Sequence, residues 1–358
     1  MKASLGLSTL FLILGLSTAW AQACIPRHVV VPGDSLGRLA ETYFGARERF
    51  IDIYRANRAV IGADPNTIRR GTILTIPCEA RADILAPFVS HEAAAELIGR
   101  GDVQVVDIRP SSTFGEGLLP RSLSLPFDGW RGQGQNPGAP AAVSDLERMI
   151  GGAGLRLDRP ILLVHERPTP FDTGRAAYVA WLLKSIGAQD VGVLRGGYRG
   201  WQAADRPIVT APLRANPIVV NLTFNPAWTA TREEVAAISA GDAPGTLLDV
   251  RPPSLSRAVD SVGRFLNTTL RRAETRPVGP LHSIATADDV GVEVLLSLKE
   301  QDIDWQRAPV ISFCNTGELA ALTWYYASEV SGLENVKLYP ESTIGWVQAG
   351  GALVPPES

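Results

Sequence analysis

Residues 310–320 read Val310-Ile311-Ser312-Phe313-Cys314-Asn315-Thr316-Gly317-Glu318-Leu319-Ala320. The first four form a short, mostly apolar run, and a turn that contains a glycine closes it. This combination is typical of a buried strand in a parallel sheet. Because residues 320–330 have a helical composition, the stretch predicts a strand, a tight turn and a helix, with Cys314 at the turn.

A cysteine at such a turn faces free backbone N–H groups at the positive end of a helix dipole. We expect this setting to lower the pKa of the thiol and to hold anions. The alternative is a buried structural cysteine, which is the commoner role of a lone cysteine. The position of Cys314 at the turn favours a reactive thiol.

Other classes of thiol enzyme do not fit the sequence. A phosphatase or arsenate reductase of the Cys-x5-Arg type needs an arginine at the position of Ala320 to hold its oxyanion. A disulfide oxidoreductase needs a Cys-x-x-Cys pair, which the chain does not contain. The formal net charge of −3 and the absence of a basic cluster give no indication of a nucleic-acid partner.

The N-terminus indicates export. Residues 5–16 form an apolar core that follows a single early positive charge, and small residues at Ala19, Ala21 and Ala23 offer cleavage sites. The pattern predicts a signal peptide over residues 1–23 and a periplasmic protein. No other segment is long and apolar enough to predict a membrane span.

The chain has three cysteines. Cys24 and Cys78 bracket a compact block, and we expect a disulfide between them that contributes about 3–4 kcal/mol. Lipid attachment at Cys24, or an unpaired Cys24, remains an alternative. With the disulfide formed, Cys314 is the odd thiol, free to react.

Residues 24–78 predict a strand, two helices and a second strand. This block resembles a LysM domain over its whole length, through Pro32-Gly33-Asp34-Ser35-Leu36, Asn57 and Leu74-Thr75-Ile76-Pro77. LysM domains bind polymers of N-acetylglucosamine, so the resemblance implies a peptidoglycan partner and attachment to the cell wall. An adaptor that binds no glycan is the alternative.

The rest of the chain repeats one order of elements. Residues 88–208 and 229–352 each contain a helix, a strand that ends in Asp-x-Arg, a second apolar strand, a helix and a last strand before a tryptophan. The order predicts a duplicated α/β domain, with parallel sheets that carry helices on both faces. Our alignment of the copies places Glu166 at the position of Cys314. We therefore expect no thiol chemistry in the first copy, and expect Glu166 to be solvated or at a domain interface.

The two copies resemble the rhodanese superfamily in its tandem form, over residues 88–352. The residues that carry the resemblance are Asp107-Ile108-Arg109, Gly196-Gly197, Asp249-Val250-Arg251 and Ile311-Ser312-Phe313-Cys314-Asn315-Thr316-Gly317. The resemblance implies an inert first domain and a catalytic second domain. It implies transfer of sulfane sulfur from thiosulfate or a similar anion to cyanide or a thiol, through a persulfide on Cys314.

This chemistry requires no metal or organic cofactor. The backbone N–H groups of Asn315, Thr316, Gly317, Glu318 and Leu319 would cradle the persulfide and the departing anion. We expect the Glu318 carboxylate to oppose a dianionic donor. We also expect Asp249 and Arg251 to brace the loop by an ion pair, as Asp107 and Arg109 do in the first copy.

A second interpretation is a catalytically silent scaffold that the LysM-like block holds at the cell wall. Cys314 favours the enzyme, because silent copies tend to lose the thiol. Thiosulfate, a persulfide, a polysulfide and 3-mercaptopyruvate all suit a thiolate in an amide cradle. The sequence therefore leaves the donor open.

Overall fold

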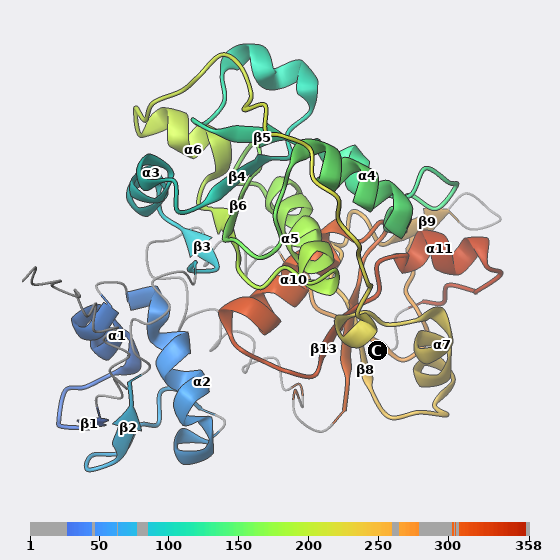
Figure 1. Ribbon diagram of the computed structural model, residues 1–358. Coiled ribbons are helices and arrows are strands. Elements are labelled where there is room, and N and C mark those ends of the chain that lie inside the picture. Colours follow the sequence, from blue (N-terminus) through green and yellow to red (C-terminus); the bar gives the residue numbers. More distant parts are fainter. Residues whose placement is uncertain are drawn as a thin grey trace, which may run out of the picture.

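The computed structural model describes residues 27–44, 47–62, 64–76, 85–259, 265–278, 303, 305 and 308–355. The expected leader, Cys24 and Cys78 lie outside these residues. The described chain forms a small N-terminal unit and two α/β units, which Figure 1 shows in blue, in green and in yellow to red.

The small unit has the predicted order of strand, helix, helix and strand. Its elements are β1 (Arg27–Val29), α1 (Leu36–Phe44), the 3-10 turn η1 (Arg47–Arg49), α2 (Phe50–Ile61) and β2 (Ile73–Thr75). The two strands pair antiparallel. Ser35 caps α1 by accepting a hydrogen bond from the Arg38 amide at 3.2 Å. Asn57 joins α2 to β2, because its side chain bonds both the N–H and the C=O of Thr75.

The first α/β unit has a parallel five-stranded sheet in the order β3-β7-β6-β4-β5. Its strands are β3 (Phe88–Val89), β4 (Gln104–Asp107), β5 (Ser122–Ser124), β6 (Ile161–Val164) and β7 (Val191–Leu194). Its helices are α3 (His91–Arg100), α4 (Val143–Ala153), α5 (Pro170–Ser185) and α6 (Gly197–Ala203), and its 3-10 turns are η3 (Ser111–Glu116) and η4 (Phe127–Trp130).

The second α/β unit has a parallel four-stranded sheet in the order β11-β8-β12-β13. Its described elements are η5 (Pro226–Trp228), α7 (Arg232–Ala240), β8 (Thr246–Asp249), β9 (Arg257–Val259), β10 (Phe265–Asn267), β11 (Ala273–Thr275), β12 (Val310–Phe313), α10 (Glu318–Tyr325), the π-helical turn η6 (Tyr326–Val330), β13 (Val336–Leu338) and α11 (Ser342–Gln348). β9 and β10 pair antiparallel beside the sheet. A parallel bridge from Thr229 to Leu338 stands where β3 pairs with β7 in the first unit. The two sheets therefore have the same strand order.

Helices cover both faces of each sheet. In the first unit, α3 and α6 pack on one face and α4 and α5 on the other. Adjacent residues of β6 point to opposite faces of the sheet. Leu162 packs against α3 and α6, Leu163 packs on the side of α4 and α5, and both are fully buried. In the second unit, α7 packs on the outer face and α10 on the inner face.

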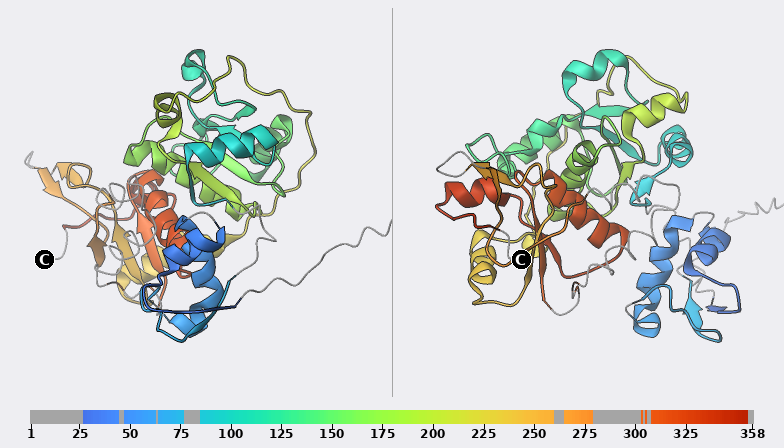
Figure 2. Two further views of the ribbon diagram at one scale, coloured as in Figure 1. Left: turned by 90° about the vertical axis from the view of Figure 1, so that its left-hand side faces the viewer. Right: turned by 180° about the vertical axis from the view of Figure 1, so that it is seen from behind.

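The inner faces of the two units share one hydrophobic core. α5 packs against α10, and both helices belong to a single cluster of buried side chains. Figure 2 shows the two units stacked on each other, with the small unit beside the second one. Trp201 and Trp324 are buried, and Trp346 packs against the cluster that lies under α7.

The small unit contacts the second α/β unit at a π-helical turn. The Arg55 guanidinium donates to the carbonyls of Ser328 and Glu329, at 3.3 and 3.4 Å. Both carbonyls lie in the π-helical turn η6, so Arg55 adds a donor from the small unit to the backbone of the second α/β unit. Arg58 adds an ion pair with Glu334 at 3.1 Å.

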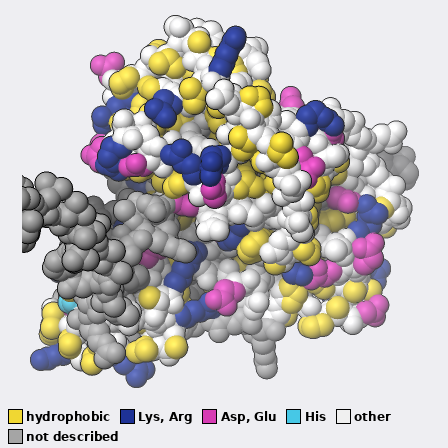
Figure 3. Space-filling view, in the orientation of Figure 1, with side chains coloured by type: hydrophobic (Ala, Val, Ile, Leu, Met, Phe, Trp, Pro, Cys, Tyr) yellow, Lys and Arg dark blue, Asp and Glu magenta, His cyan; other side chains and the backbone are white. Residues whose placement is uncertain are grey.

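The described residues contain no helix that is long and apolar enough to cross a membrane. Lys and Arg side chains are interspersed with Asp, Glu and apolar side chains on the face in Figure 3.

Candidate active site

Cys314 lies at the carboxyl end of β12, in the middle of the second sheet. The neighbouring strand β8 ends at Asp249 in register with Phe313. The carboxyl ends of parallel strands meet at one edge of a sheet, which is where open α/β sheets bind ligands. The strand, turn and helix that the sequence predicts are present, except that α10 begins at Glu318 rather than at Ala320.

The loop after Cys314 forms a cradle around the thiol. The Gly317 N–H donates to the Cys314 Sγ at 3.0 Å, and the backbones of Thr316 and Ala320 also bond to it. Gly317 has a φ of +96°, a left-handed conformation that favours glycine. The Leu319 side chain points into the shared core, so only its backbone belongs to the loop.

The thiol is only 3% exposed, and its electrostatic environment differs from our expectation. Burial raises the pKa of Cys314, and the Glu318 carboxylate raises this pKa further. The N–H groups of the cradle act in the opposite direction without cancelling the rise. The expectation of a lowered pKa was therefore wrong, because desolvation of the thiolate outweighs the amide dipoles.

Asn315 connects the loop to the end of β8. Its Oδ1 accepts from Arg251 Nη1 and from Thr343 Oγ1, both at 3.0 Å. Arg251 in turn donates to both carboxylate oxygens of Asp249, at 2.8 and 2.6 Å. Both charged side chains are nearly inaccessible to solvent. This geometry places Asp249 and Arg251 behind the loop rather than beside the thiol.

The first two residues of α11 also hold the cysteine. The Cys314 N–H donates to Ser342 Oγ at 3.1 Å, and the Thr343 N–H donates to the Cys314 carbonyl at 3.0 Å. Ser342 adopts a φ of +53°, which is uncommon for a residue other than glycine. The sequence gives no signal for Ser342, because no local motif marks a serine that reaches across to another strand end.

Arg131 reaches this loop from the first α/β unit. It follows η4, and its Nη1 donates to Glu318 Oε1 at 2.5 Å while Nη2 bonds the Thr316 carbonyl. The Thr316 hydroxyl donates to the other Glu318 oxygen at 2.5 Å. The Glu318 charge is therefore paired rather than open to a ligand. The sequence gives no signal for Arg131, which lies 187 positions before Glu318.

The strand registers identify His165, rather than Glu166, as the counterpart of Cys314. Asp107 pairs with Val164 as Asp249 pairs with Phe313, so the next residues, His165 and Cys314, correspond. The Tyr198 N–H donates to the His165 carbonyl as the Thr343 N–H donates to the Cys314 carbonyl. The alignment that gave Glu166 was wrong by one position. The conclusion that the first copy has no thiol there still holds.

The family comparison matches part of the chain. The family described as "Rhodanese-like domain" matches residues 90–204, which are the first α/β unit. This part of the chain is a rhodanese-like domain.

Sequence relatives cover both α/β units. A putative thiosulfate sulfurtransferase of Synechococcus elongatus is 24% identical over 307 residues, which are 79% of this chain and 88% of the relative. A putative thiosulfate sulfurtransferase of Mycobacterium tuberculosis is 28% identical over 290 residues, which are 77% of this chain and 98% of the relative. With the rhodanese-like domain, these relatives indicate that the chain is a thiosulfate sulfurtransferase-like transferase.

Solved structures show the same fold. SseA from Escherichia coli, described as a 3-mercaptopyruvate sulfotransferase with the "Rhodanese" fold, superposes with a TM-score of 0.61 at 20% identity. The match covers 72% of this chain and 98% of SseA. An anaerobic ergothioneine biosynthesis enzyme from Chlorobium limicola superposes with a TM-score of 0.62 at 15% identity, over 73% of this chain and 68% of that one.

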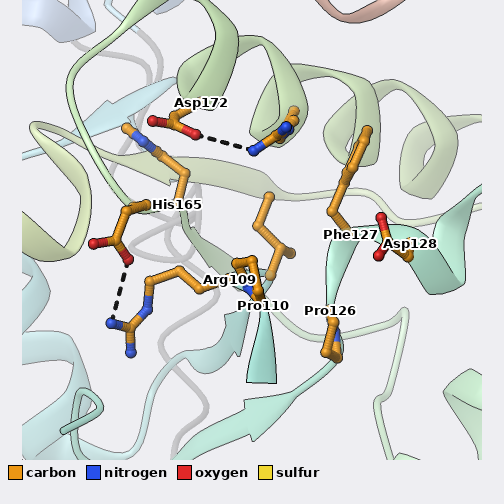
Figure 4. A pocket seen from close by; sticks show the side chains of 10 residues that line it. Arg109, Pro110, Pro126, Phe127, Asp128, His165 and Asp172 are labelled. Carbon is orange, nitrogen blue, oxygen red and sulfur yellow. Dashed lines mark hydrogen bonds and ion pairs between the residues drawn. The ribbon is translucent and has the colours of Figure 1, made fainter. Parts of the chain in front are cut away.

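The rhodanese-like domain at residues 90–204 keeps a pocket where the second unit has its cysteine. This cavity has a volume of about 200 Å³ and lies between the ends of β4 and β6 and the start of α5 (Figure 4). Charged side chains of both signs line it, namely Arg109, Asp128, Glu166, Asp172 and Arg175.

Glu166 in this pocket is mostly buried and ion-paired, rather than a solvated residue as expected. Its side chain is 13% exposed and forms ion pairs with Arg199 at 2.7 Å and with Arg109 at 3.6 Å. Pro168 and Pro170 follow it and have no N–H groups. The first loop therefore has fewer amides for an anion cradle than the loop after Cys314.

Proposed function

We propose that the chain moves a sulfane sulfur from a small anionic donor, such as thiosulfate, to a thiophilic acceptor through a persulfide on Cys314. In this proposal the second α/β unit is a second, catalytic rhodanese-like domain, and the first is inert. The identical strand order of the two sheets supports the duplication. The lack of a thiol at His165 supports an inert first domain.

In the first half-reaction, the Cys314 thiolate attacks the outer sulfur of thiosulfate. A new S–S bond forms to Sγ, the S–S bond of thiosulfate breaks, and sulfite leaves with the bonding electron pair. The Gly317 N–H already points at Sγ, so the attacking thiolate has a donor that needs no rearrangement.

In the second half-reaction, a nucleophile removes the outer sulfur. Cyanide attacks this sulfur, the Cys314 S–S bond breaks, thiocyanate leaves and the thiolate returns with the electron pair. A thiolate acceptor reacts in the same way and becomes a persulfide. The two halves share the enzyme persulfide, so the kinetics are ping-pong.

One observation carries the proposal: the cradle donates a backbone N–H to the Cys314 Sγ at 3.0 Å. A cysteine that served only as core packing would not require this donor or the left-handed glycine that aims it. Arg251 and Ser342 hold the loop from two further strand ends, so the cradle is formed before a donor arrives.

The test is the mass of the peptide that contains Cys314 after incubation with a donor. Thiosulfate, 3-mercaptopyruvate and a polysulfide are supplied separately, and we expect the peptide to gain the mass of one sulfur atom with at least one of them. Cyanide should then remove this mass and release thiocyanate. The Cys314→Ser variant is the control and should gain nothing. An unmodified thiol with every donor would overturn the proposal.

We further propose that the protein is exported and that residues 24–78 bind peptidoglycan as a LysM domain, with Cys24 joined to Cys78. The order of β1, α1, α2 and β2 supports this proposal. The measurement is retention on insoluble peptidoglycan of the full chain and of a chain that lacks residues 24–78. Formation of the Cys314 persulfide serves as the control for folding. Equal retention of the two chains would refute glycan binding by this unit.

A further inference from the structure

Arg131 is an arginine of the inert domain that is buried against the catalytic loop. Its side chain is 10% exposed, and its guanidinium lies 5.2 Å from the ring centres of both Phe127 and Tyr178. The two aromatic rings, whose centres are 5.7 Å apart, restrict the position of the guanidinium and replace part of its hydration. The side chain can therefore direct its N–H groups at fixed places on the partner domain.

Those N–H groups meet two residues of the cradle. One bonds the Glu318 carboxylate and the other bonds the Thr316 carbonyl. Both Glu318 oxygens are occupied, because the Thr316 hydroxyl bonds the second one. Thr316 and Glu318 flank Gly317, whose N–H contacts the thiol, so the three contacts fix the segment that carries this N–H.

We propose that Arg131 is a positioning residue for Cys314 in the reaction proposed above: it aligns the Thr316–Glu318 segment with the thiol and neutralises the Glu318 carboxylate. The inert domain would then be required for sulfur transfer, although it holds no reacting group. This role also explains how a loop that contains a glutamate can accept an anionic donor.

The charged groups around Cys314 determine what the loss of Arg131 would do. Glu318 raises the pKa of the thiol, and Arg131 is its ion-pair partner. The other charged groups near the loop form pairs of their own: Arg251 with Asp249 at the end of β8, and Arg232 with Glu341 before α11. Tyr178 of α5 faces the loop as a neutral phenol, since burial raises its pKa. Loss of Arg131 would leave Glu318 as the uncompensated charge.

The experiment compares Arg131→Met, Glu318→Gln and the double variant. The rate of Cys314 alkylation by iodoacetamide is followed against pH, by the mass of the Cys314 peptide. We expect Arg131→Met to raise the apparent pKa of the thiol by about one unit, and hence to slow alkylation near neutral pH about tenfold. The double variant should return to within a few tenths of a unit of the wild type, because the uncompensated carboxylate is gone.

Arg175→Met is the matched control. Arg175 also lies over the Phe127 ring, at 5.7 Å, but it pairs with Asp172 of its own helix. Loss of Arg175 should leave the pH dependence of Cys314 alkylation unchanged. Arg131→Lys keeps the charge and serves as a second variant in case Arg131→Met does not fold. We expect Arg131→Lys to raise the apparent pKa of the thiol by less than Arg131→Met does. The positioning role is overturned if Arg131→Met keeps the wild-type profile, or if Glu318→Gln does not restore it in the double variant.

Alkylation does not depend on a sulfur donor, so the two proposals fail separately. If the wild type gains no sulfur from any donor but Arg131→Met shifts the alkylation profile, the proposed function fails and Arg131 still positions the thiol. If the wild type gains sulfur and Arg131→Met behaves like it, only the positioning role fails.

Discussion

The Cys314 thiol is subject to two opposed effects at the scale of single residues. Burial and the Glu318 carboxylate favour the neutral thiol, whereas the N–H groups of the loop favour the thiolate. The direction of the pKa shows that desolvation is the larger effect. The N–H groups of the cradle therefore favour a charged sulfur but do not offset the effect of burial on the thiol pKa.

The sign of the shift predicts the pH dependence. A pKa above that of a free cysteine, which is about 8.5, means that the thiolate fraction near neutral pH is smaller in the folded protein than in the unfolded chain. The rate of Cys314 alkylation in the folded protein should still rise at pH values where the rate for the urea-unfolded chain has reached its plateau. Peptide mass separates Cys314 from the other cysteines. A plateau of the folded protein at lower pH than that of the unfolded chain would contradict this.

Gly317 is the residue whose backbone the cradle depends on most. A Cβ there would lie 2.8 Å from the Pro340 carbonyl and 3.2 Å from the Tyr178 ring, in addition to the strain of its positive φ. We expect Gly317→Ala to lower the free energy of unfolding by about 2–4 kcal/mol and to reduce persulfide formation.

Gly350 provides the matched control for this substitution. It has a similar φ of +86°, but a Cβ there would have no atom within 4 Å. Gly350→Ala should therefore cost only the backbone strain, about 1 kcal/mol, and leave persulfide formation intact. Urea unfolding and the Cys314 peptide mass measure the two effects. Equal losses in the two variants would exclude the close approach as the cause.

At the scale of elements, β4 and β8 end in the same buried ion pair. Arg109 donates to Asp107 in the first unit as Arg251 donates to Asp249 in the second. The pairs differ in what lies beyond them, because Arg109 faces the Glu166 carboxylate and Arg251 bonds Asn315 of the catalytic loop. The repeat thus allows a structural role to be separated from a role in sulfur transfer.

We expect Arg109→Met and Arg251→Met to destabilise the protein to a similar extent, by about 3–5 kcal/mol, since each leaves a buried carboxylate without its partner. Only Arg251→Met should also slow persulfide formation at a temperature where both variants are folded. Urea unfolding and single-turnover sulfur loading provide the two measurements. Equal slowing by the two variants would show that the effect is one of stability alone.

Local sequence patterns predict the strands β4, β6, β7, β8, β12 and β13 and the helices α3, α5, α7 and α10, because a four-residue apolar run and a capping serine or threonine act through neighbours in the chain. They do not predict the short strands β5, β9, β10 and β11. The copy alignment failed at His165 for a physical reason. α5 begins five residues after His165, whereas α10 begins four residues after Cys314. Four residues before the start of α5 lies Glu166, as Cys314 lies four residues before α10. The strand registers show that the loop after His165 is one residue longer than the loop after Cys314.

At the scale of the whole molecule, the catalytic loop depends on contacts that no local pattern encodes. Arg131 reaches it from the first α/β unit, and α5 packs against α10 in one shared core. Residues far apart in sequence meet there only after both sheets have formed. The sequence could therefore predict the cysteine and its turn, but not the contacts by which the first α/β unit holds them.

Gly174 tests this dependence without touching the thiol. It lies in α5, and a Cβ there would be 2.6 Å from the Glu318 carbonyl oxygen, at the start of α10. Helix propensity alone favours alanine over glycine by about 1 kcal/mol, so any loss of stability must come from the crowded contact.

We expect Gly174→Ala to destabilise the protein by about 1–3 kcal/mol and to slow persulfide formation, because it pushes α10 away from α5 and disturbs the cradle at Glu318. Gly152 of α4 is the matched control, since a Cβ there would have no atom within 4 Å. Gly152→Ala should leave both stability and sulfur loading at or above the wild-type level. Thermal unfolding and the Cys314 peptide mass report the two quantities. If Gly174→Ala behaved like Gly152→Ala, the first α/β unit would not constrain the loop after Cys314 through α5.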